Sequence, residues 1–293
     1  MNADQIRAKR LELVEKYGEW TAHNIHLGDG VYTYDANDSR FDNSIQGYMK
    51  VLRRMLQVAS DLTNQRPNQL RVLDLACLEG IYAIEFALHG AEVVGVEIRE
   101  ANVEKARFAK DALNLRNVTF VQDDVRNLSV EKYGQFDVVL CIGILYHLDV
   151  PDAIHLVEKI CDVCTRLAII DTHVGLNQAR TFAYQGHEYH GWGYTEHAED
   201  ATAEQKTKAL HSSIDNPKSF WFTRPSLYNL LADIGFTSAY ECQMPATPPQ
   251  FGDRDTIVAL KGQLAETDIL SFSTRAGIAP TRWPEEFRIA AVQ

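Results

Sequence analysis

Apolar residues near the start of the chain are spaced as they are in helices. Residues 3–17 and 44–62 are predicted helices, and in the second the apolar positions repeat every three or four residues. The segment between them, 20–38, is rich in aromatic residues, Gly and Asp, which cannot continue either helix. The pattern therefore predicts a helical extension over residues 1–66. The periodic positions of its second helix are Ile45, Tyr48, Met49, Leu52, Met55 and Leu56.

From Arg71 onward, short apolar runs alternate with amphipathic helices. Strands are predicted over residues 71–76, 91–98, 118–124, 136–145 and 166–174. Helices are predicted over residues 81–90, 99–114 and 151–164, the last starting with Pro in its first turn. Strands that alternate with helices indicate a parallel sheet covered on both faces.

Residues 175–224 interrupt this alternation before a helix over 224–236 restores it. Two last strands follow, and the short connection between them (244–252) suits a hairpin better than a crossover. We therefore predict an α/β, Rossmann-like fold with a seven-stranded, mostly parallel sheet and an antiparallel last strand. The expected organisation is an N-terminal helical extension and cover (1–66), a core (67–262) with a lid insertion after strand five (175–224), and an unassigned tail (263–293).

Composition limits the partners of such a chain. A net charge of −11 repels a phosphate backbone unless basic residues gather on one face, so a small-molecule partner is favoured over nucleic acid. No apolar run reaches the roughly 20 residues that span a bilayer, and the first residues lack the features of a signal peptide. We expect a cytoplasmic protein with no membrane partner, and the oligomeric state stays open. Five cysteines give no disulfide framework, and Cys161-x-x-Cys164 is expected to pack in the core.

Polar and small residues stand where the predicted strands end, and ligands of open α/β sheets bind at this edge. Strand one runs into the loop Asp74–Gly80, where small residues let the backbone approach a ligand. Strand two ends in Glu97, which can accept hydrogen bonds from both hydroxyls of a ribose. After strand three, Asp123 or Asp124 can accept an adenine amino hydrogen while Val125 covers the ring.

In order and spacing, the run from Val72 to Val174 resembles the core of the class I S-adenosylmethionine-dependent methyltransferases. This resemblance implies S-adenosylmethionine as cofactor, with its methionine moiety at the first loop, its ribose at Glu97 and its adenine at Asp124. The residues expected to bind it are Asp74, Ala76, Cys77, Gly80, Glu97, Asp123, Asp124, Val125, Cys141 and Ile142.

The first loop departs from the D-x-G-x-G-x-G pattern usual in that family. Ala76 keeps the close approach, and Leu78 predicts a loop that needs no positive φ at that position. The same departure argues against a nicotinamide dehydrogenase, which needs G-x-G-x-x-G near the pyrophosphate.

The end of strand four should face the reacting centre. His147 is the candidate general base, and Tyr146 either lines the substrate pocket or takes part in chemistry. A histidine that only caps the next turn is the alternative for His147. The insertion should overhang this edge as a lid, with aromatic faces for a planar or sugar-like substrate. Expected substrate contacts are Tyr32, Tyr184, His187, His190 and Trp192.

Several alternatives accompany these assignments. The insertion could instead be a solvated loop, and a metal site at His187-x-x-His190 with His197 is the less favoured possibility, so no metal is expected. The segment Trp20–Tyr34, with Trp20, His23, His26 and Tyr32, is a second cover of the site or an arm that only packs on the domain.

The leading functional hypothesis is methyl transfer to an oxygen or nitrogen of a small metabolite, aromatic or sugar-like. Residues 140–151 and 20–30 also resemble, over two short patches, methyltransferases related to those that modify the wobble uridine of tRNA. A tRNA-modifying enzyme and a non-catalytic S-adenosylmethionine-binding protein are therefore the alternatives.

Overall fold

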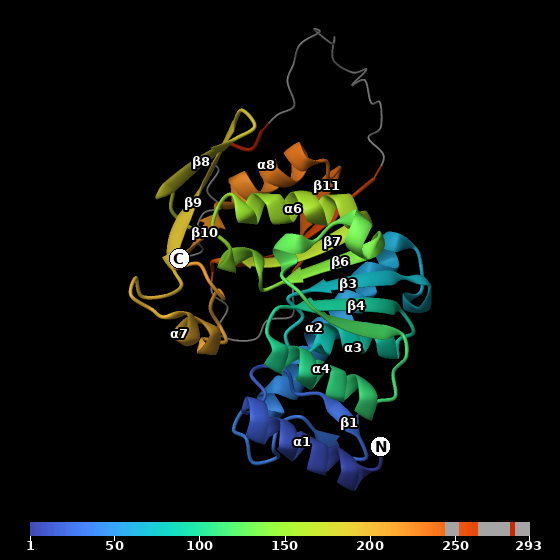
Figure 1. The fold of residues 1–293 in the computed structure, drawn as a ribbon. Helices are drawn as coiled ribbons and strands as arrows, with labels where there is room; N and C mark the ends of the chain where they lie inside the picture. The colour runs from blue at the N-terminus through green and yellow to red at the C-terminus, as the bar shows by residue number, and fades with distance from the viewer. Residues whose placement is uncertain (244–251, 263–281, 285–293) are drawn as a thin grey trace.

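The core of the protein is a seven-stranded sheet. The computed structural model describes residues 1–243, 252–262 and 282–284, and its sheet has the order β11-β12-β7-β6-β3-β4-β5 (Figure 1). β3, β4, β5, β6 and β7 run parallel, whereas β12 is antiparallel to both β7 and β11. This confirms the predicted fold with its antiparallel last strand. The strands are β3 (Arg71–Leu75), β4 (Glu92–Glu97), β5 (Val118–Gln122), β6 (Phe136–Ile142), β7 (Cys164–His173), β11 (Ser238–Glu241) and β12 (Arg254–Leu260).

Helices cover both faces of this sheet, as expected from strands that are apolar on both sides. On one face lie α2 (Phe41–Thr63), α3 (Ile81–Leu88) and α4 (Glu100–Ala112), and on the other lie α6 (Asp152–Val163) and α8 (Arg224–Ile234). A short helix, α5 (Val130–Tyr133), joins β5 to β6. Successive strand residues alternate between two apolar layers: Val72 packs in the first and Leu73 in the second.

The N-terminal extension packs on the α4 side of the sheet. It consists of α1 (Ala3–Tyr17), a small hairpin of β1 (His26–Gly28) and β2 (Val31–Tyr32), and α2, which begins at Phe41 rather than at the predicted residue 44. α1 starts with a capping box in which the Asn2 and Gln5 side chains accept each other's backbone N–H, and it packs against α4.

The insertion after β7 is an ordered subdomain with elements that the sequence did not predict. β8 (Arg180–Tyr184), β9 (His187–Thr195) and β10 (Lys218–Phe222) form an antiparallel sheet in the order β10-β9-β8, and α7 (Ala203–Lys208) stands between β9 and β10 in the chain. In Figure 1 this sheet projects from the carboxyl end of the core strands.

The predicted hairpin connection falls partly on residues 244–251, and the tail prediction falls almost wholly on 263–281 and 285–293; both stretches lie outside the described residues. Cys161 and Cys164 are both buried free thiols, which agrees with packing. Within the described ranges, every helix is too short or too polar to cross a bilayer.

Candidate functional site

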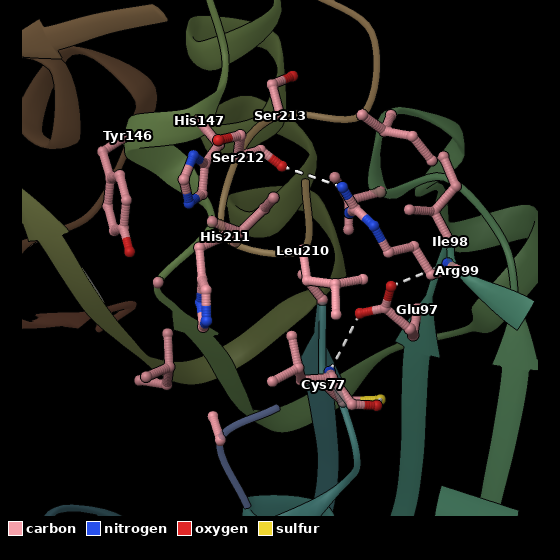
Figure 2. Close-up of a pocket in the computed structure, with 18 of the residues that line it drawn as sticks. Cys77, Glu97, Ile98, Arg99, Tyr146, His147, Leu210, His211, Ser212 and Ser213 are labelled. Atoms are coloured by element: carbon pink, nitrogen blue, oxygen red, sulfur yellow. Dashed lines mark hydrogen bonds between the residues drawn. The ribbon is translucent and has the colours of Figure 1, made fainter. Parts of the chain in front are cut away.

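A cavity of about 360 Å³ opens beyond the carboxyl ends of the parallel strands. Its volume lies in the range of small-molecule and cofactor sites. Figure 2 shows Glu97 and Arg99 on one side, Tyr146 and His147 on the other, and Leu210 with His211 of the insertion between them. The site therefore combines the strand ends predicted from sequence with a segment of the insertion.

The loop after β3 bends through three left-handed positions. Ala76, Leu78 and Gly80 have φ angles of 51°, 50° and 84°, so the expectation that Leu78 needs no positive φ is wrong. The loop tolerates this conformation because its backbone is held at several points. The Leu78 N–H donates to Oε2 of Glu97 at 3.1 Å, and the Cys77 N–H donates to the Val96 carbonyl at 3.0 Å.

Asp74 and Gly80 frame this loop in different ways. Asp74 lines the cavity at 1% exposure and accepts the Ala83 N–H at 3.1 Å, and burial raises the pKa of its carboxyl to about 8. Gly80 does not line the cavity. A Cβ there would lie 2.7 Å from the Phe120 ring, so its small size serves packing of the loop against β5.

Glu97, the predicted ribose ligand, stands at the wall of the cavity. It lines the cavity at 3% exposure, and its Oε1 accepts the Arg99 N–H at 2.8 Å while Oε2 accepts that of Leu78. Each oxygen has a second lone pair that can accept a hydroxyl. Burial raises the pKa of Glu97 even though these backbone N–H groups favour the ionised form. Apolar side chains of Ile98, Val125 and Ile142 line the adjacent wall.

Three further residues predicted to bind the cofactor, Asp123, Asp124 and Cys141, are less available to a ligand in the cavity than Glu97 is. Asp124 lines the cavity, but its two oxygens already accept from Arg126 at 2.6–3.1 Å. Asp123 points to Lys132 and Tyr133 and does not line the cavity. Cys141 is fully buried behind the wall, whereas Ala76 and Cys77 line it.

Two arginines connect this end of the cavity to the insertion. Arg99 donates from Nη2 to the carbonyls of Ala209 and Ser212, both at 3.1 Å, and Arg126 pairs with Asp215 at 2.6 Å. Residues 210–215 all line the cavity. We call residues 209–215 the strap. It crosses the end of the cavity where the predicted ribose and adenine ligands lie, and it is fastened by Arg99 and Arg126, each two residues after one of those acids.

The N-terminal cover is fastened to the cofactor loop by Glu79. This carboxylate is fully buried, and it accepts the backbone N–H groups of Thr21, Ala22 and His23, the last at 3.0 Å. Lys105 lies 3.9 Å from it. Ala22 and His23 line the cavity, so part of the predicted second cover is placed at the site.

His23 stands in this cover as a neutral imidazole. Its Nδ1 accepts the Ile81 N–H at 3.3 Å, and burial lowers its pKa to about 4, which leaves the proton on Nε2. The other aromatic residues named for the cover lie away from the cavity: Trp20 is buried against Phe108, and His26 contacts Tyr32.

The far end of the cavity is aromatic and contains one cation. The rings of His23, Tyr48 and Tyr82 meet edge to face, with centroids 5.6–6.3 Å apart. Arg254 of β12 lines the same end and donates from Nε to Asp171 at 2.8 Å. Tyr146 also lies here, and burial raises the pKa of its hydroxyl.

His147 lines the cavity and is paired with a buried carboxylate from the insertion. Its Nδ1 lies 3.0 Å and 3.1 Å from the two oxygens of Glu196, whose side chain is completely buried. Glu196 also accepts from the Ser213 N–H and the Ser219 hydroxyl at 2.9 Å and 2.8 Å. Burial opposes ionisation of Glu196, but these hydrogen bonds and the imidazole hold its pKa below the usual value. The carboxylate therefore accepts, and Nδ1 of His147 donates.

The five residues predicted to contact substrate do not line this cavity. Tyr184 donates to Glu158, and His187 lies beside a separate depression near Asp233. Tyr32 packs on Phe41. His190 and Trp192 lie on the sheet of the insertion, where Trp192 is 42% exposed. Their role in substrate binding stays a prediction.

The histidines of the insertion do not converge either. Nε2 of His197 lies 2.6 Å from the Ser213 carbonyl, and Nδ1 of His190 lies 3.0 Å from the Thr181 hydroxyl. Over the described part of the chain, no three His, Cys, Asp or Glu side chains are grouped as metal ligands.

Several site residues escaped the sequence analysis. Arg99 and Arg126 have a local signal, because each stands two residues after a predicted ligand acid, in Glu97-Ile98-Arg99 and Asp124-Val125-Arg126. Glu79 interrupts the expected run of small residues, which is a weaker signal. Glu196 and Arg254 have none, since only the tertiary fold brings them to the cavity.

Residues 72–166 match the family model of a methyltransferase domain. The ubiquinone biosynthesis O-methyltransferase of Acinetobacter baumannii (strain AYE) is 36% identical over 84 residues, which are 29% of this chain and 35% of that protein. The protein of the same name from Erwinia tasmaniensis is 30% identical over 136 residues, or 45% of this chain and 55% of that one. The chain thus spans about a third to half of the length of these relatives.

Two solved structures share the fold over most of the chain. The N-terminal domain of EvdMO1 with SAH bound has a TM-score of 0.67 at 21% identity, covering 89% of this chain and 97% of that one. Magnesium protoporphyrin IX methyltransferase (ChlM) from Synechocystis PCC 6803 with bound SAH has a TM-score of 0.52 at 18% identity, covering 88% and 97%. At this identity the likeness concerns the fold alone.

Proposed function

Because residues 72–166 match a methyltransferase domain, we propose that this chain is an S-adenosylmethionine-dependent methyltransferase that methylates a hydroxyl oxygen of a small molecule, with His147 as general base. The match to a methyltransferase domain supports the predicted family, and the presence of SAH in two structures of the same fold supports the predicted cofactor. The proposal of a hydroxyl acceptor rests on one observation: the buried Glu196 carboxylate lies 3.0 Å from Nδ1 of His147, at the wall of the cavity.

The residues of the cavity fit the cofactor. The Glu97 carboxylate would hold the ribose hydroxyls, the apolar wall of Ile98 and Val125 would cover the adenine, and the loop at Ala76 and Leu78 would face the methionine moiety. S-adenosylmethionine, when bound, supplies an electrophilic methyl group on a sulfonium sulfur. The strap, held by Arg99 and Arg126, would cover the adenosine of the bound cofactor and exclude water from it.

The histidine–carboxylate pair favours a hydroxyl acceptor over an amine acceptor. A hydroxyl must lose its proton as it is methylated, whereas a neutral amine attacks without a base. Glu196 binds the Nδ1–H of His147, so the lone pair of the imidazole is on Nε2, and no hydrogen-bond partner within the described residues occupies that nitrogen. A base fixed in this tautomer can accept the hydroxyl proton, and such groups accelerate reactions by about 10²–10⁴-fold.

The acceptor end also favours a small ring-shaped substrate. Tyr48, Tyr82 and Tyr146 present aromatic surface there, and the Nε2–H of His23 offers a hydrogen-bond donor. The names of the curated relatives, O-methyltransferases of ubiquinone biosynthesis, agree with methylation of oxygen. A structure of the N-terminal domain of EvdMO1 was determined in the presence of D-fucose, which makes sugars reasonable members of an acceptor panel.

The test is a turnover assay that measures S-adenosylhomocysteine with matched phenol, sugar and amine acceptors. We expect a hydroxyl acceptor to react, His147→Ala to lower kcat by about 100-fold or more, and Glu196→Gln to lower it by about tenfold, both with unchanged cofactor affinity. His89→Ala serves as a control, because His89 forms an exposed pair with Glu85 far from the cavity. Turnover of amines alone, or a His147→Ala variant as active as the wild type, would contradict the proposal.

A further inference from the structure

The sheet of the insertion has two unlike faces. Along β9, Gly191 and Gly193 lie on the face toward the core, where a Cβ on Gly191 would be 2.5 Å from the Phe220 ring. The alternate residues His190, Trp192 and Tyr194 lie on the opposite face, because strand side chains alternate. Trp192 and Tyr194 are 42% and 40% exposed. One face of the insertion therefore presents two large aromatic side chains to solvent.

This aromatic face is continuous with the wall of the cavity. Tyr194 stacks on Trp221 of β10 with centroids 4.7 Å apart, and Trp221 stacks on His173 at the same separation. Tyr146, which lines the cavity, meets His173 edge to face at 4.7 Å. The Nε1–H of Trp221 also donates to the Tyr146 carbonyl at 3.0 Å. An unbroken series of rings thus leads from the exposed sheet face to the acceptor end.

The same strand side also carries the residue that orients the proposed base. Glu196 follows Tyr194 by two residues, and its N–H continues the pairing with the β10 side through the Pro217 carbonyl. At about 3.3 Å per residue, Tyr194 lies about 7 Å and Trp192 about 13 Å along the strand from Glu196. These spacings suit a ring that is joined to another ring held beside His147.

We propose that the face formed by His190, Trp192 and Tyr194, here called the aromatic platform and backed by the buried Trp221, binds a sugar ring attached to the methyl acceptor. The inference rests on the proposed function and specifies its substrate class: a glycoside of at least two rings, one in the cavity and one on the platform. It also gives His190 and Trp192 the substrate contact that the cavity itself does not provide.

A sugar fits this platform better than a second aromatic ring. The C–H groups on one face of a pyranose pack against aromatic surface, and its hydroxyls need polar partners at the edge. Such partners adjoin Trp192: the His190 ring and the Thr181 hydroxyl lie 3.0 Å apart on the neighbouring strand pair β8–β9. An aryl group would use the aromatic faces but would offer no hydroxyl to this polar pair.

Saturation-transfer NMR tests whether the platform binds a sugar. The protein is first filled with S-adenosylhomocysteine, which has no methyl group to transfer, so that sugar binding is measured without turnover. The probes are methyl β-cellobioside, methyl β-lactoside and methyl α-maltoside, each compared with methyl β-glucoside. We expect at least one disaccharide to receive saturation in both rings. Replacing Trp192 by Ala, or Tyr194 by Ala, should weaken its binding about three- to tenfold, as expected for loss of one aromatic contact.

Two variants control for folding and for non-specific contact. Trp192→Phe keeps an aromatic face and should retain most of the affinity. Tyr240→Ala removes a similarly exposed aromatic residue on β11, 55% exposed, and should change nothing. Equal binding of the disaccharide by wild type and Trp192→Ala, or no disaccharide binding while the cofactor product binds normally, would overturn the platform. Failure to bind S-adenosylhomocysteine at all would instead refute the proposed function.

Discussion

The two ends of the cavity are built in different ways. The cofactor end uses Asp74, Glu97 and Val125, which stand at the ends of strands that are adjacent in the sheet and close in sequence. The acceptor end takes His23 from the N-terminal cover and Arg254 from the last strand. The cofactor end therefore follows from a local pattern repeated at each strand end, whereas the acceptor end depends on packing between distant segments.

Glu79 and Arg99 are among the residues that hold distant segments against the cofactor end. Glu79 fixes the N-terminal cover, and Arg99 fixes the strap. Variants at these positions, and at residues of the cofactor end itself, measure how far the two ends are independent.

Glu79→Gln should have the largest effect, a loss of about 3 kcal/mol in the free energy of unfolding. An amide has one acceptor oxygen, and its NH2 group would face either the N–H donor of Thr21 or those of Ala22 and His23; each unsatisfied buried donor costs about 1–3 kcal/mol. It would also remove the carboxylate that lies 3.9 Å from the ammonium group of Lys105, a side chain that is 1% exposed. Urea unfolding measures the loss, and limited proteolysis shows whether cleavage begins in the cover.

Glu85→Gln is the control for that variant, because Glu85 lies on the helix that follows Glu79 and its carboxylate pairs with His89 at the surface. If Glu79→Gln unfolds within 1 kcal/mol of the wild type, the cover is not held by this carboxylate.

The sequence predicts which strand ends line this end of the cavity, for a physical reason. A parallel sheet brings the ends of successive strands to one edge, so the chain order of Asp74 and Glu97 already implies that they lie side by side. Glu196 cannot be found in this way, because its position beside His147 depends on the pairing of β9 with β10. The φ of Leu78 was mispredicted because its strain is offset by a hydrogen bond to Glu97, a tertiary partner.

Glu97→Ala should weaken cofactor binding by about 1–3 kcal/mol, which corresponds to about 5- to 150-fold in Kd. The variant removes the acceptor for the ribose hydroxyls and frees the Leu78 N–H. Calorimetry with S-adenosylhomocysteine measures the change. Glu92→Ala, at the other end of β4 and paired with Arg71, should bind normally. An unchanged Kd in a folded Glu97→Ala variant would refute the ribose assignment.

Asp74→Asn should alter how the stability of the cofactor-free protein depends on pH. Because burial raises the pKa of Asp74 to about 8, the folded state keeps a proton that the unfolded chain releases near pH 4. The wild type therefore loses stability as pH rises between these values, and the variant lacks this contribution. Its stability relative to wild type should increase by about 2 kcal/mol from pH 5.5 to 7.5, measured by urea unfolding. A constant difference across that range would mean that Asp74 is already ionised.

Arg99→Ala should have the smallest effect, and it tests only the attachment of the strap. Arg99 donates to the carbonyls of Ala209 and Ser212, and hydrogen bonds from a charged donor contribute about 1.5–3 kcal/mol in favourable settings and less where water can replace them. Because this guanidinium is half-buried, we expect about 1 kcal/mol, seen as about fivefold weaker binding of S-adenosylhomocysteine and faster amide exchange over residues 205–215. Arg116→Ala, which replaces an exposed arginine after α4, should change neither quantity. Since the strap also donates the Ser213 N–H to Glu196, a fall in kcat beyond the change in affinity would show that the two ends are coupled through it.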